Sequence, residues 1–227
     1  MMCPLDRPVW SSLCTCHSAL SLGDALARRY APEINLFASA RDDTPQALAR
    51  LAALVGAGER VFSRQVPHIG VPPGFLVHKD AKGVQMIATG ATPRAQPPED
   101  FVELSDADAP EMQALAQLTE PGPYLARTHT MGRFIGIRIA GRLAAMAGER
   151  FRFPGYTEVS GVCTHPDFRG RGLARRLSTA VSANIAARGE QPFLHAWKTN
   201  HPAIALYESL GFEIRTDVNV AVLERDA

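Results

Sequence analysis

The amino-acid sequence predicts a mixed α/β (α+β) fold, in which a mostly antiparallel sheet contains one parallel pair of strands. Two observations lead to this fold class. Three apolar segments follow one another between residues 133 and 164 with only short turns between them, which is typical of neighbouring antiparallel strands. The third of these, 156–164, is joined to a fourth, 193–197, by a long helix. Such a right-handed crossover makes the two strands parallel neighbours.

Composition and charge are those of an ordinary globular protein. The chain has 227 residues, of which 46% are hydrophobic and 21% are charged, and its formal net charge is +1. A charge so close to zero gives no reason to expect a nucleic-acid partner. No apolar run approaches the roughly 20 residues that a membrane span needs, and the N-terminus does not resemble a secretory signal. We therefore expect a soluble, cytoplasmic protein without a membrane partner.

The four cysteines, Cys3, Cys14, Cys16 and Cys163, indicate neither a disulfide framework nor a metal site. The segment Cys14-Thr15-Cys16-His17 is a candidate metal site, but its spacing is not that of a zinc pair and no second ligand pair follows. Incidental thiols are the simpler interpretation, so we expect no metal. The lack of a disulfide framework favours a reducing compartment.

A proline-rich segment, 91–99, divides the chain. It contains three prolines within six residues, which fit neither a helix nor a central strand and indicate a linker. The predicted domains are an N-terminal α/β domain, 1–98, and a longer C-terminal domain, 99–227.

The N-terminal domain shows one clear helix, which begins after Thr44 and ends before Gly56. Its apolar stripe consists of Leu48, Leu51, Leu54 and Val55. A strand is predicted at 60–65. A hairpin is predicted from strands 74–77 and 84–88, which would pair across a turn at 80–83. These elements favour a small packing domain without chemistry of its own.

The C-terminal domain begins with a helix that follows Pro110 and ends at Pro121-Gly122-Pro123. Strands 133–139 and 143–151 then form a hairpin with its turn at Ala140-Gly141, and Pro154-Gly155 turns the chain into strand 156–164. An amphipathic helix at 172–188, strand 193–197, a short helix at 202–210 and strand 212–223 complete the order.

The bend after strand 156–164 has the features of an anion cradle. It reads Arg169-Gly170-Arg171-Gly172-Leu173-Ala174 and opens the amphipathic helix. Glycines let backbone N–H groups converge, and the helix start adds unpaired donors and its positive dipole end. A tight strand-to-helix turn is the alternative, but the flanking arginines favour a bound phosphate. No Gly-Lys-Ser or Gly-Lys-Thr follows, so a P-loop enzyme is disfavoured.

These residues resemble the GNAT superfamily of N-acyltransferases. The segment 169–174 matches the family pattern of Arg or Gln, two residues, Gly, one residue, and Gly or Ala. It follows an apolar strand and the linker His165-Pro166-Asp167-Phe168. A second block, from Asn200 through Tyr207 to Gly211-Phe212, resembles the family's ending, so the likeness covers about residues 101–225. The sequence resembles a bacterial-type subgroup of this family that has an extra N-terminal domain. That domain is often a degenerate copy of the same fold, and the elements predicted for residues 1–98 are compatible with such a copy.

The resemblance implies acetyl-CoA as co-substrate and assigns residues to it. The cradle residues Arg169, Gly170, Arg171, Gly172, Leu173 and Ala174 would hold the pyrophosphate. Backbone groups of Val162, Cys163 and Thr164 would pair with the pantetheine amides, and an N–H near Val162 or Cys163 would stabilise the thioester oxyanion. The Asn200 side chain would contact pantetheine, although capping the helix at Pro202 is an alternative role.

Two residues are candidates for the chemistry of direct transfer in a ternary complex. Tyr207 occupies the position of the family's general acid, with a core aromatic as the alternative. Glu158 is the candidate base, because strand alternation would place it on the same face as Val162. A salt bridge to Arg150 or Arg138 is an equally good interpretation of Glu158. His195 is expected to be a core histidine with satisfied hydrogen bonds.

The expected acceptor is a primary amine on a small molecule or a protein, and Arg127 or Arg133 could bind a carboxylate on an amino-acid-like acceptor. A non-catalytic acyl-CoA-binding or regulatory module, which keeps the cradle without turnover, is the competing hypothesis.

Overall fold

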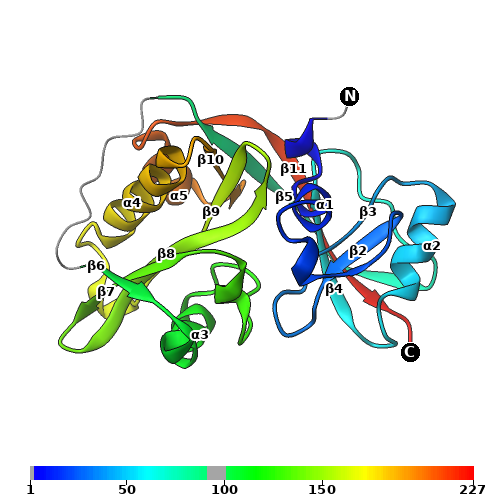
Figure 1. Ribbon diagram of the computed structural model, residues 1–227, viewed down its shortest axis with the longest axis horizontal. Coiled ribbons are helices and arrows are strands. Elements are labelled where there is room, and N and C mark those ends of the chain that lie inside the picture. The colour runs from blue at the N-terminus through cyan, green and yellow to red at the C-terminus, as the bar shows by residue number, and fades with distance from the viewer. Residues whose placement is uncertain (1–2, 91–100) are drawn as a thin grey trace.

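The computed structural model describes residues 3–90 and 101–227, and it is built around one eight-stranded sheet (Figure 1). The strands lie in the order β4-β11-β5-β10-β9-β8-β7-β6, and all neighbours are antiparallel except β9 and β10. A three-stranded sheet, β1-β2-β3, lies in the N-terminal part. The predicted mixed fold with one parallel pair is confirmed.

The strands and helices have the following bounds. The strands are β1 (Ser21–Gly23), β2 (Ala27–Tyr30), β3 (Ala38–Ala40), β4 (Arg60–Gln65), β5 (Phe75–Ala88), β6 (Phe101–Leu104), β7 (Phe134–Ile139), β8 (Arg142–Phe153), β9 (Tyr156–Thr164), β10 (Gln191–Trp197) and β11 (Phe212–Arg225). The α-helices are α1 (Pro8–Cys14), α2 (Pro45–Ala53), α3 (Ala109–Thr119), α4 (Leu173–Ala187) and α5 (His201–Glu208).

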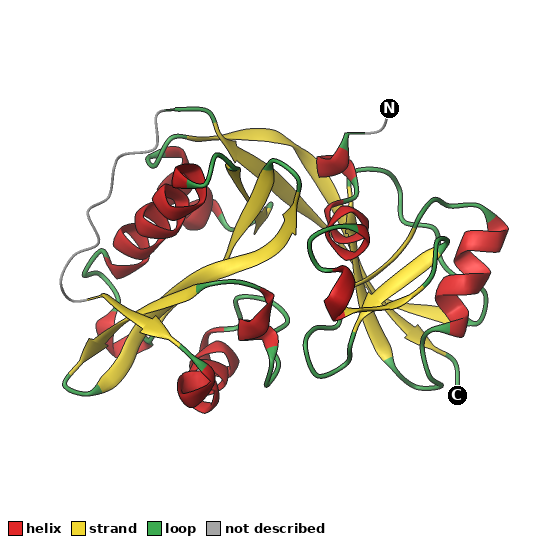
Figure 2. Cartoon of the chain, viewed as in Figure 1, coloured by secondary structure: helices red, strands yellow, loops and turns green. Residues whose placement is uncertain are grey.

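Helices cover both faces of the C-terminal half of the sheet, and Figure 2 shows α3 and α4 on opposite sides of β8 and β9. Leu177, Val181 and Ile185 of α4 are buried against one face. Met112 and Leu115 of α3 are buried against the other face. The amphipathic stripe predicted for the long helix is therefore the contact that positions α4 on the sheet.

The parallel pair separates along its length. β9 and β10 pair only between Tyr156–Glu158 and Gln191–Phe193, after which β10 continues along β5 as far as Trp197. The last residues of β9 therefore have a backbone edge that β10 does not cover. This separation positions the candidate site.

A β-bulge changes which side chains share a face of β9. Gly148 pairs with Ser160 whereas Met146 pairs with Cys163, so β9 carries one residue more than β8 in this interval. Gly161, with φ of +62°, supplies the left-handed conformation that the bulge requires. The expectation that Glu158 and Val162 share a face is therefore wrong. Val162 packs with Val159 against the core beneath α4, while Glu158 lies on the opposite face.

The hairpin expected within residues 74–88 is also wrong, because β5 is one continuous strand. β11 pairs with it from Phe75 to Ala88, and this long partner keeps the polar segment 80–83 extended. Gly83 lies in the sheet opposite Trp197 and Val218. A Cβ at Gly83 would lie 2.9 Å from the carbonyl oxygen of Ala196, so glycine serves close strand packing here instead of a turn.

The N-terminal part contributes to the main sheet. β4 and β5 lie on either side of β11, and in Figure 1 β5 and β11 run between the half with α4 and the half with α2. Thr44 caps α2 as expected, because its Oγ1 accepts from the Ala47 N–H at 3.4 Å. The predicted linker at 91–99 lies outside the described residues, and the division into 1–98 and 99–227 stays a prediction.

Candidate active site

The separation of β9 and β10 contains a cavity of about 200 Å³, which we call the transfer cavity. Residues 159–162 of β9 form one wall and residues 195–197 of β10 form the other, with Tyr207 and Asn200 from the α5 segment and Glu120 and Gly122 from the end of α3. The cavity combines uncovered backbone with several side chains.

A second cavity, of about 350 Å³, lies at the predicted anion cradle. Its lining contains Thr164 and every residue of the predicted segment from Arg169 to Ala174. Gly170 and Gly172 have φ of +77° and +70°, and Gly172 is the N-cap of α4. A Cβ added at either glycine would have no atom within 4 Å, so there is room for a side chain. Glycine is required at these positions because of the left-handed backbone conformation. The structure thus brings the cradle residues together.

Tyr207 lies on α5 and lines the transfer cavity. Its side chain is 9% exposed and packs with the core beneath α4. Burial, together with the nearby charge of Glu158, raises the pKa of the Tyr207 phenol to about 12. The phenol therefore stays protonated at neutral pH and is a proton donor at the cavity wall.

Glu158 is fully buried and does not line the transfer cavity. Its two carboxylate oxygens accept from Nε and Nη2 of Arg150, each at 2.7 Å. Burial alone would raise the pKa of Glu158, but the Arg150 charge and hydrogen bonds and the His195 hydrogen bond outweigh it and hold the pKa well below its usual range. This is the salt bridge to Arg150 that the sequence analysis gave as the alternative to a catalytic base. It argues against Glu158 as a group that accepts a proton directly from the amine.

His195 is the satisfied core histidine that the sequence favoured. Its Nδ1 lies 2.7 Å from Glu158 Oε1, and its Nε2 lies 3.1 Å from Gln85 Nε2. Gln85 Oε1 accepts from Arg215, so the Gln85 amide donates to His195, and the neutral histidine carries its proton on Nδ1. Burial lowers the pKa of His195 to about 4. Both ring nitrogens are occupied, which leaves neither for an acceptor.

Asn200 performs the capping role and also lines the transfer cavity. Its Oδ1 accepts from the Ala203 N–H at 3.2 Å, so the amide nitrogen is the group it can offer to a ligand. Cys163 lines neither cavity, and its thiol is buried in the core beneath α3. Burial raises the pKa of that thiol to about 12.

Comparison with known proteins decides the family. The crystal structure of a GNAT-family protein from Novosphingobium aromaticivorans DSM 12444 is 46% identical, covers 100% of both chains and aligns with a TM-score of 0.93. The chain belongs to the GNAT family of acetyltransferases. The model of the FR47-like protein family also matches residues 134–221, from the start of β7 into β11.

Two further relatives match this GNAT protein over very different shares of its chain. A GCN5-related N-acetyltransferase from Kribbella flavida is 16% identical, with a TM-score of 0.67 over 100% of this chain and 97% of its own, and this likeness shows the fold alone. Mycothiol acetyltransferase of Saccharomonospora viridis is 44% identical over 66 residues, which are 28% of this chain. The match spans 22% of that relative's length, so it concerns one segment.

Three residues that line the transfer cavity of this GNAT protein were not predicted from the sequence to belong to the site. Arg150 and Glu120 line the transfer cavity, and Arg64 reaches it from β4, in the part expected to lack chemistry. An arginine within the predicted strand 60–65 was the available signal, but only pairing of β4 with β11 places that strand here.

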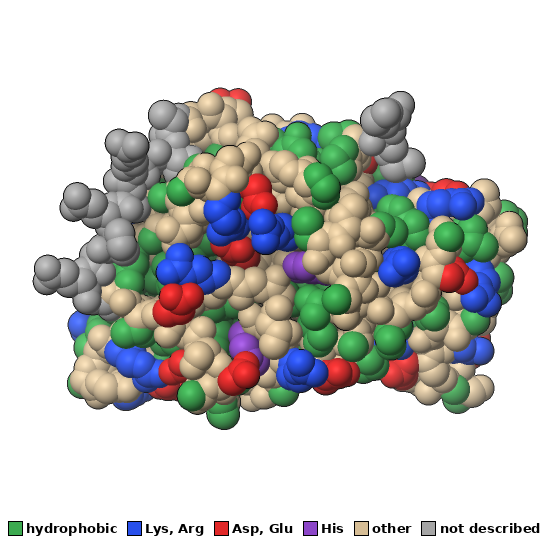
Figure 3. Space-filling view, viewed as in Figure 1, with side chains coloured by type: hydrophobic (Ala, Val, Ile, Leu, Met, Phe, Trp, Pro, Cys, Tyr) green, Lys and Arg blue, Asp and Glu red, His purple; other side chains and the backbone are tan. Residues whose placement is uncertain are grey.

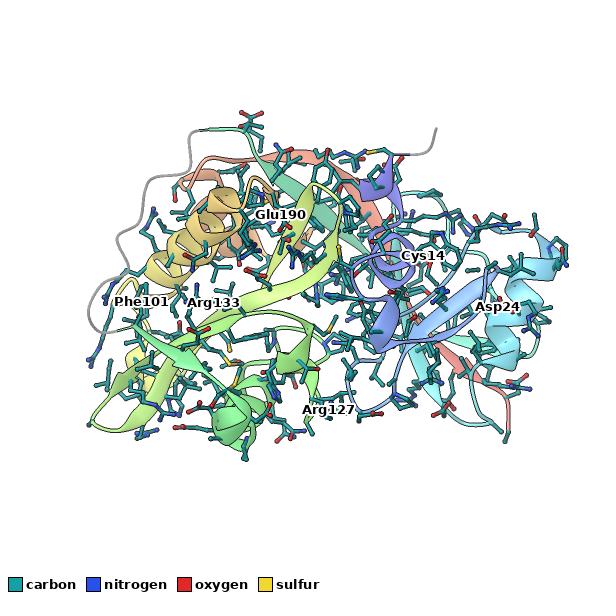
Figure 4. The ribbon with its side chains drawn as sticks, in the orientation of Figure 1. Cys14, Asp24, Phe101, Arg127, Arg133 and Glu190 are labelled. Carbon is teal, nitrogen blue, oxygen red and sulfur yellow. The ribbon has the colours of Figure 1, made fainter. Side chains whose placement is uncertain are left out.

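The arginines expected to bind an acceptor carboxylate lie elsewhere in the GNAT protein. Arg133 pairs with Glu103 at 3.0 Å, and Arg127 lies at the rim of the molecule in Figure 4, 3.6 Å from Glu33. Neither lines the transfer cavity, so the geometry gives no support to the expectation that one of them binds an acceptor carboxylate, and it stays a prediction.

All four cysteines of the GNAT protein are free, and residues 3–90 and 101–227 contain no group of three or more potential metal ligands. No helix in them is long and apolar enough to cross a membrane. On the face drawn in Figure 3, acidic and basic side chains are intermixed, so that face shows no patch of one sign.

Proposed function

We propose that this GNAT-family protein transfers the acetyl group of acetyl-CoA to a primary amine, by direct attack of the amine in a ternary complex. The observation that carries the proposal is the course of β9. Its residues 159–162 line the transfer cavity and its last residue, Thr164, lines the cradle cavity. One uncovered strand edge thus runs between a phosphate site and a buried proton donor.

The chain's own groups fit an extended, phosphorylated thioester. Backbone N–H groups of the segment from Arg169 to Ala174, at the start of α4, would hold a pyrophosphate. The uncovered backbone of Val162, Cys163 and Thr164 would pair with amide groups of the pantetheine arm, and the Asn200 amide would add one donor. The thioester, when bound, supplies an acyl group that is activated toward attack by an amine.

Tyr207 is proposed as the general acid. Its phenol, with a pKa near 12, is protonated at neutral pH, and it lines the same cavity as the free end of β9. It can therefore give its proton to the departing thiolate. An N–H near Val162 or Cys163 would stabilise the oxyanion that develops during attack.

Glu158 is proposed to support the acid and not to remove the proton from the amine. Its buried negative charge contributes to the raised pKa of Tyr207 and so keeps the phenol protonated. The carboxylate that does line the transfer cavity is Glu120, which is solvent-exposed at the end of α3. We propose Glu120, directly or through water, as the group that receives the proton of the amine.

The test compares wild-type protein with Tyr207→Phe in an amine panel with acetyl-CoA, with release of free CoA thiol as the readout. We expect kcat to fall about 10²- to 10⁴-fold while acetyl-CoA still binds. Tyr156→Phe is the matched control, because Tyr156 begins β9 and lines neither cavity. An unchanged rate for Tyr207→Phe would remove the acid role.

The competing hypothesis, a non-catalytic acyl-CoA-binding module, is tested by the same assay. Tight acetyl-CoA binding without thiol release by any amine would favour it over the enzyme.

A further inference from the structure

Arg64 reaches the transfer cavity with part of its hydrogen-bonding capacity unused. Its side chain is only 10% exposed, and its Nη1 lies 3.8 Å from Glu158 Oε1, which is beyond hydrogen-bonding distance. Within the described part of the chain, its Nε and Nη1 are buried without a hydrogen-bond partner. The ring of Phe37, 5.3 Å from the guanidinium carbon, fixes the side chain without satisfying these donors. Buried donors nearly always have partners, so these two donors leave the charge of the Arg64 guanidinium without a hydrogen-bonded anion among the described residues.

The charges around Arg64 do not balance. Arg150 already binds both oxygens of Glu158, at 2.7 Å each. His195 is neutral near pH 7, because burial lowers its pKa to about 4. Burial, and then repulsion by Arg150, lowers the pKa of Arg64 to about 9, so Arg64 keeps its charge at neutral pH. Two guanidinium groups therefore share one carboxylate, and one further anion would balance the cluster.

Arg64 also lines a neighbouring cavity of about 430 Å³, which we call the outer cavity. The outer and transfer cavities share Arg64, Glu120, Gly122 and Trp197, so they adjoin. Lys79 also lines the outer cavity, where its Nζ lies 4.6 Å from the centre of the Trp197 ring. The Tyr124 hydroxyl, in the same lining, is buried without a partner among the described residues. The outer cavity is therefore lined by several hydrogen-bond donors and two cationic side chains. Glu120 is the one carboxylate residue in the linings of the outer and transfer cavities.

The phosphates of the co-substrate do not explain this cluster. The cradle cavity shares no lining residue with either the transfer cavity or the outer cavity. Arg64 therefore borders the transfer and outer cavities at a distance from the cradle, on the side where we propose that the amine enters.

We propose that Arg64 binds a carboxylate of the acceptor, and that the acceptor belongs to the class of free amino acids and related small amines that carry a carboxylate. The inference rests on the proposed acetyl transfer. A guanidinium presents paired N–H donors that match the two oxygens of a carboxylate. With its carboxylate on Arg64 and its ammonium group near Glu120, a zwitterionic acceptor would complement both charges of the shared lining.

The first experiment uses the wild-type protein with acetyl-CoA and matched sets of acceptors. Each set contains an L-amino acid, its primary amide and the corresponding decarboxylated amine. We expect the acid to exceed both partners in kcat/KM by about tenfold or more, the factor that corresponds to about 1.4 kcal/mol. We also expect the analogue of the best acid that lacks the amino group to inhibit competitively against that acceptor, and the primary amide of this analogue not to.

The second experiment asks whether Arg64 causes that preference. In Arg64→Gln the ratio of kcat/KM between acid and amide should fall towards one, mainly through KM of the acid. Arg64→Lys keeps the charge but loses the paired donors, so it should retain an intermediate ratio even if Arg64→Gln folds poorly. Arg60→Gln is the matched control, since Arg60 lies on the same strand and pairs with Glu224 at the surface.

The outcomes separate the inference from the proposed function. Efficient acetylation of amides and decarboxylated amines, with acids no better, would overturn the carboxylate site and leave the transferase intact. An acid preference that survives Arg64→Gln and Arg64→Lys would overturn the assignment to Arg64. Tight acetyl-CoA binding without thiol release from any set would overturn the proposed function, and the inference with it.

Discussion

The two ends of the candidate site are built in different ways. The cradle end is one continuous segment, from Arg169 to Ala174, whose backbone conformation makes the site. The other end, where we propose that the acceptor binds, is called the acceptor end and is assembled from side chains on β4, the end of α3, β8 and β10, including Arg64, Glu120 and Arg150. A site made of local backbone is visible in sequence, whereas a site made of distant side chains depends on how strands pair and on which charges are buried together.

The largest expected effect tests the buried charges at the acceptor end. Glu158→Gln should lower the free energy of unfolding by about 3–5 kcal/mol, because it leaves the charge of Arg150 buried without its partner. Chemical denaturation measures this loss.

Glu190→Gln is the control for that substitution. Glu190, labelled in Figure 4, also pairs with two arginines, Arg152 and Arg188, but these are 43% and 33% exposed. We expect a loss of about 1 kcal/mol or less for Glu190→Gln. Equal losses for the two variants would show that burial of the Glu158 pair adds nothing.

The next effect is the response of stability to pH. Burial lowers the pKa of both His195 and His17 to about 4, from an ordinary value of 6.5. The unfolded chain therefore binds more protons than the folded chain between these values. The stability that the neutral histidines contribute is fully present above pH 6.5 and is lost as pH falls towards 4.

Glu158 adds a second loss at lower pH. Its folded pKa lies below the ordinary 4.5, so its contribution is present above about pH 4.5 and disappears as pH falls further. Urea unfolding at intervals from pH 8 to pH 4 should show a decline that begins near pH 6.5. A stability that stays constant from pH 6.5 to pH 4.5 would contradict the buried, neutral histidines.

The smallest expected effect tests the cradle end. Gly172→Ala places a side chain at φ of +70° and should lower the free energy of unfolding by about 1–2 kcal/mol. Because it also disturbs the N–H groups at the start of α4, we expect the Kd for acetyl-CoA to rise about five- to tenfold. Isothermal titration with acetyl-CoA measures the binding.

Gly58→Ala is a closely matched control for the cradle. Gly58 has the same φ of +70° and equally open surroundings, but it lies outside the cradle. The two variants should lose similar stability, and only Gly172→Ala should weaken acetyl-CoA binding. If Gly172→Ala and Gly58→Ala bind acetyl-CoA equally well, the segment is an ordinary strand-to-helix turn and not a phosphate site.

Much of the C-terminal fold could be predicted from the sequence, because its signals are local. Alternation, the turn at Ala140-Gly141, whose residues have φ of +51° and +80°, and the apolar stripe of α4 each depend on residues close in the chain. Two predictions were wrong at places where a strand distant in the sequence determines the local structure. The hairpin expected at 74–88 became one strand because β11 pairs along all of it, and the bulge at Gly161 moved Val162 to the other face from Glu158.

The sequence by itself predicted the cradle, because a glycine pattern at a helix start makes its site from adjacent backbone, and its resemblance to the GNAT family supplied the candidate acid Tyr207. Tertiary structure alone decided the acceptor end. It paired Glu158 with Arg150 and His195, and it brought Arg64 from the N-terminal part to the same cluster. The physical reason is burial. Whether a charged side chain is a base, a partner or an open binding site depends on which charges share its low-dielectric surroundings, and these come from strands far apart in the chain.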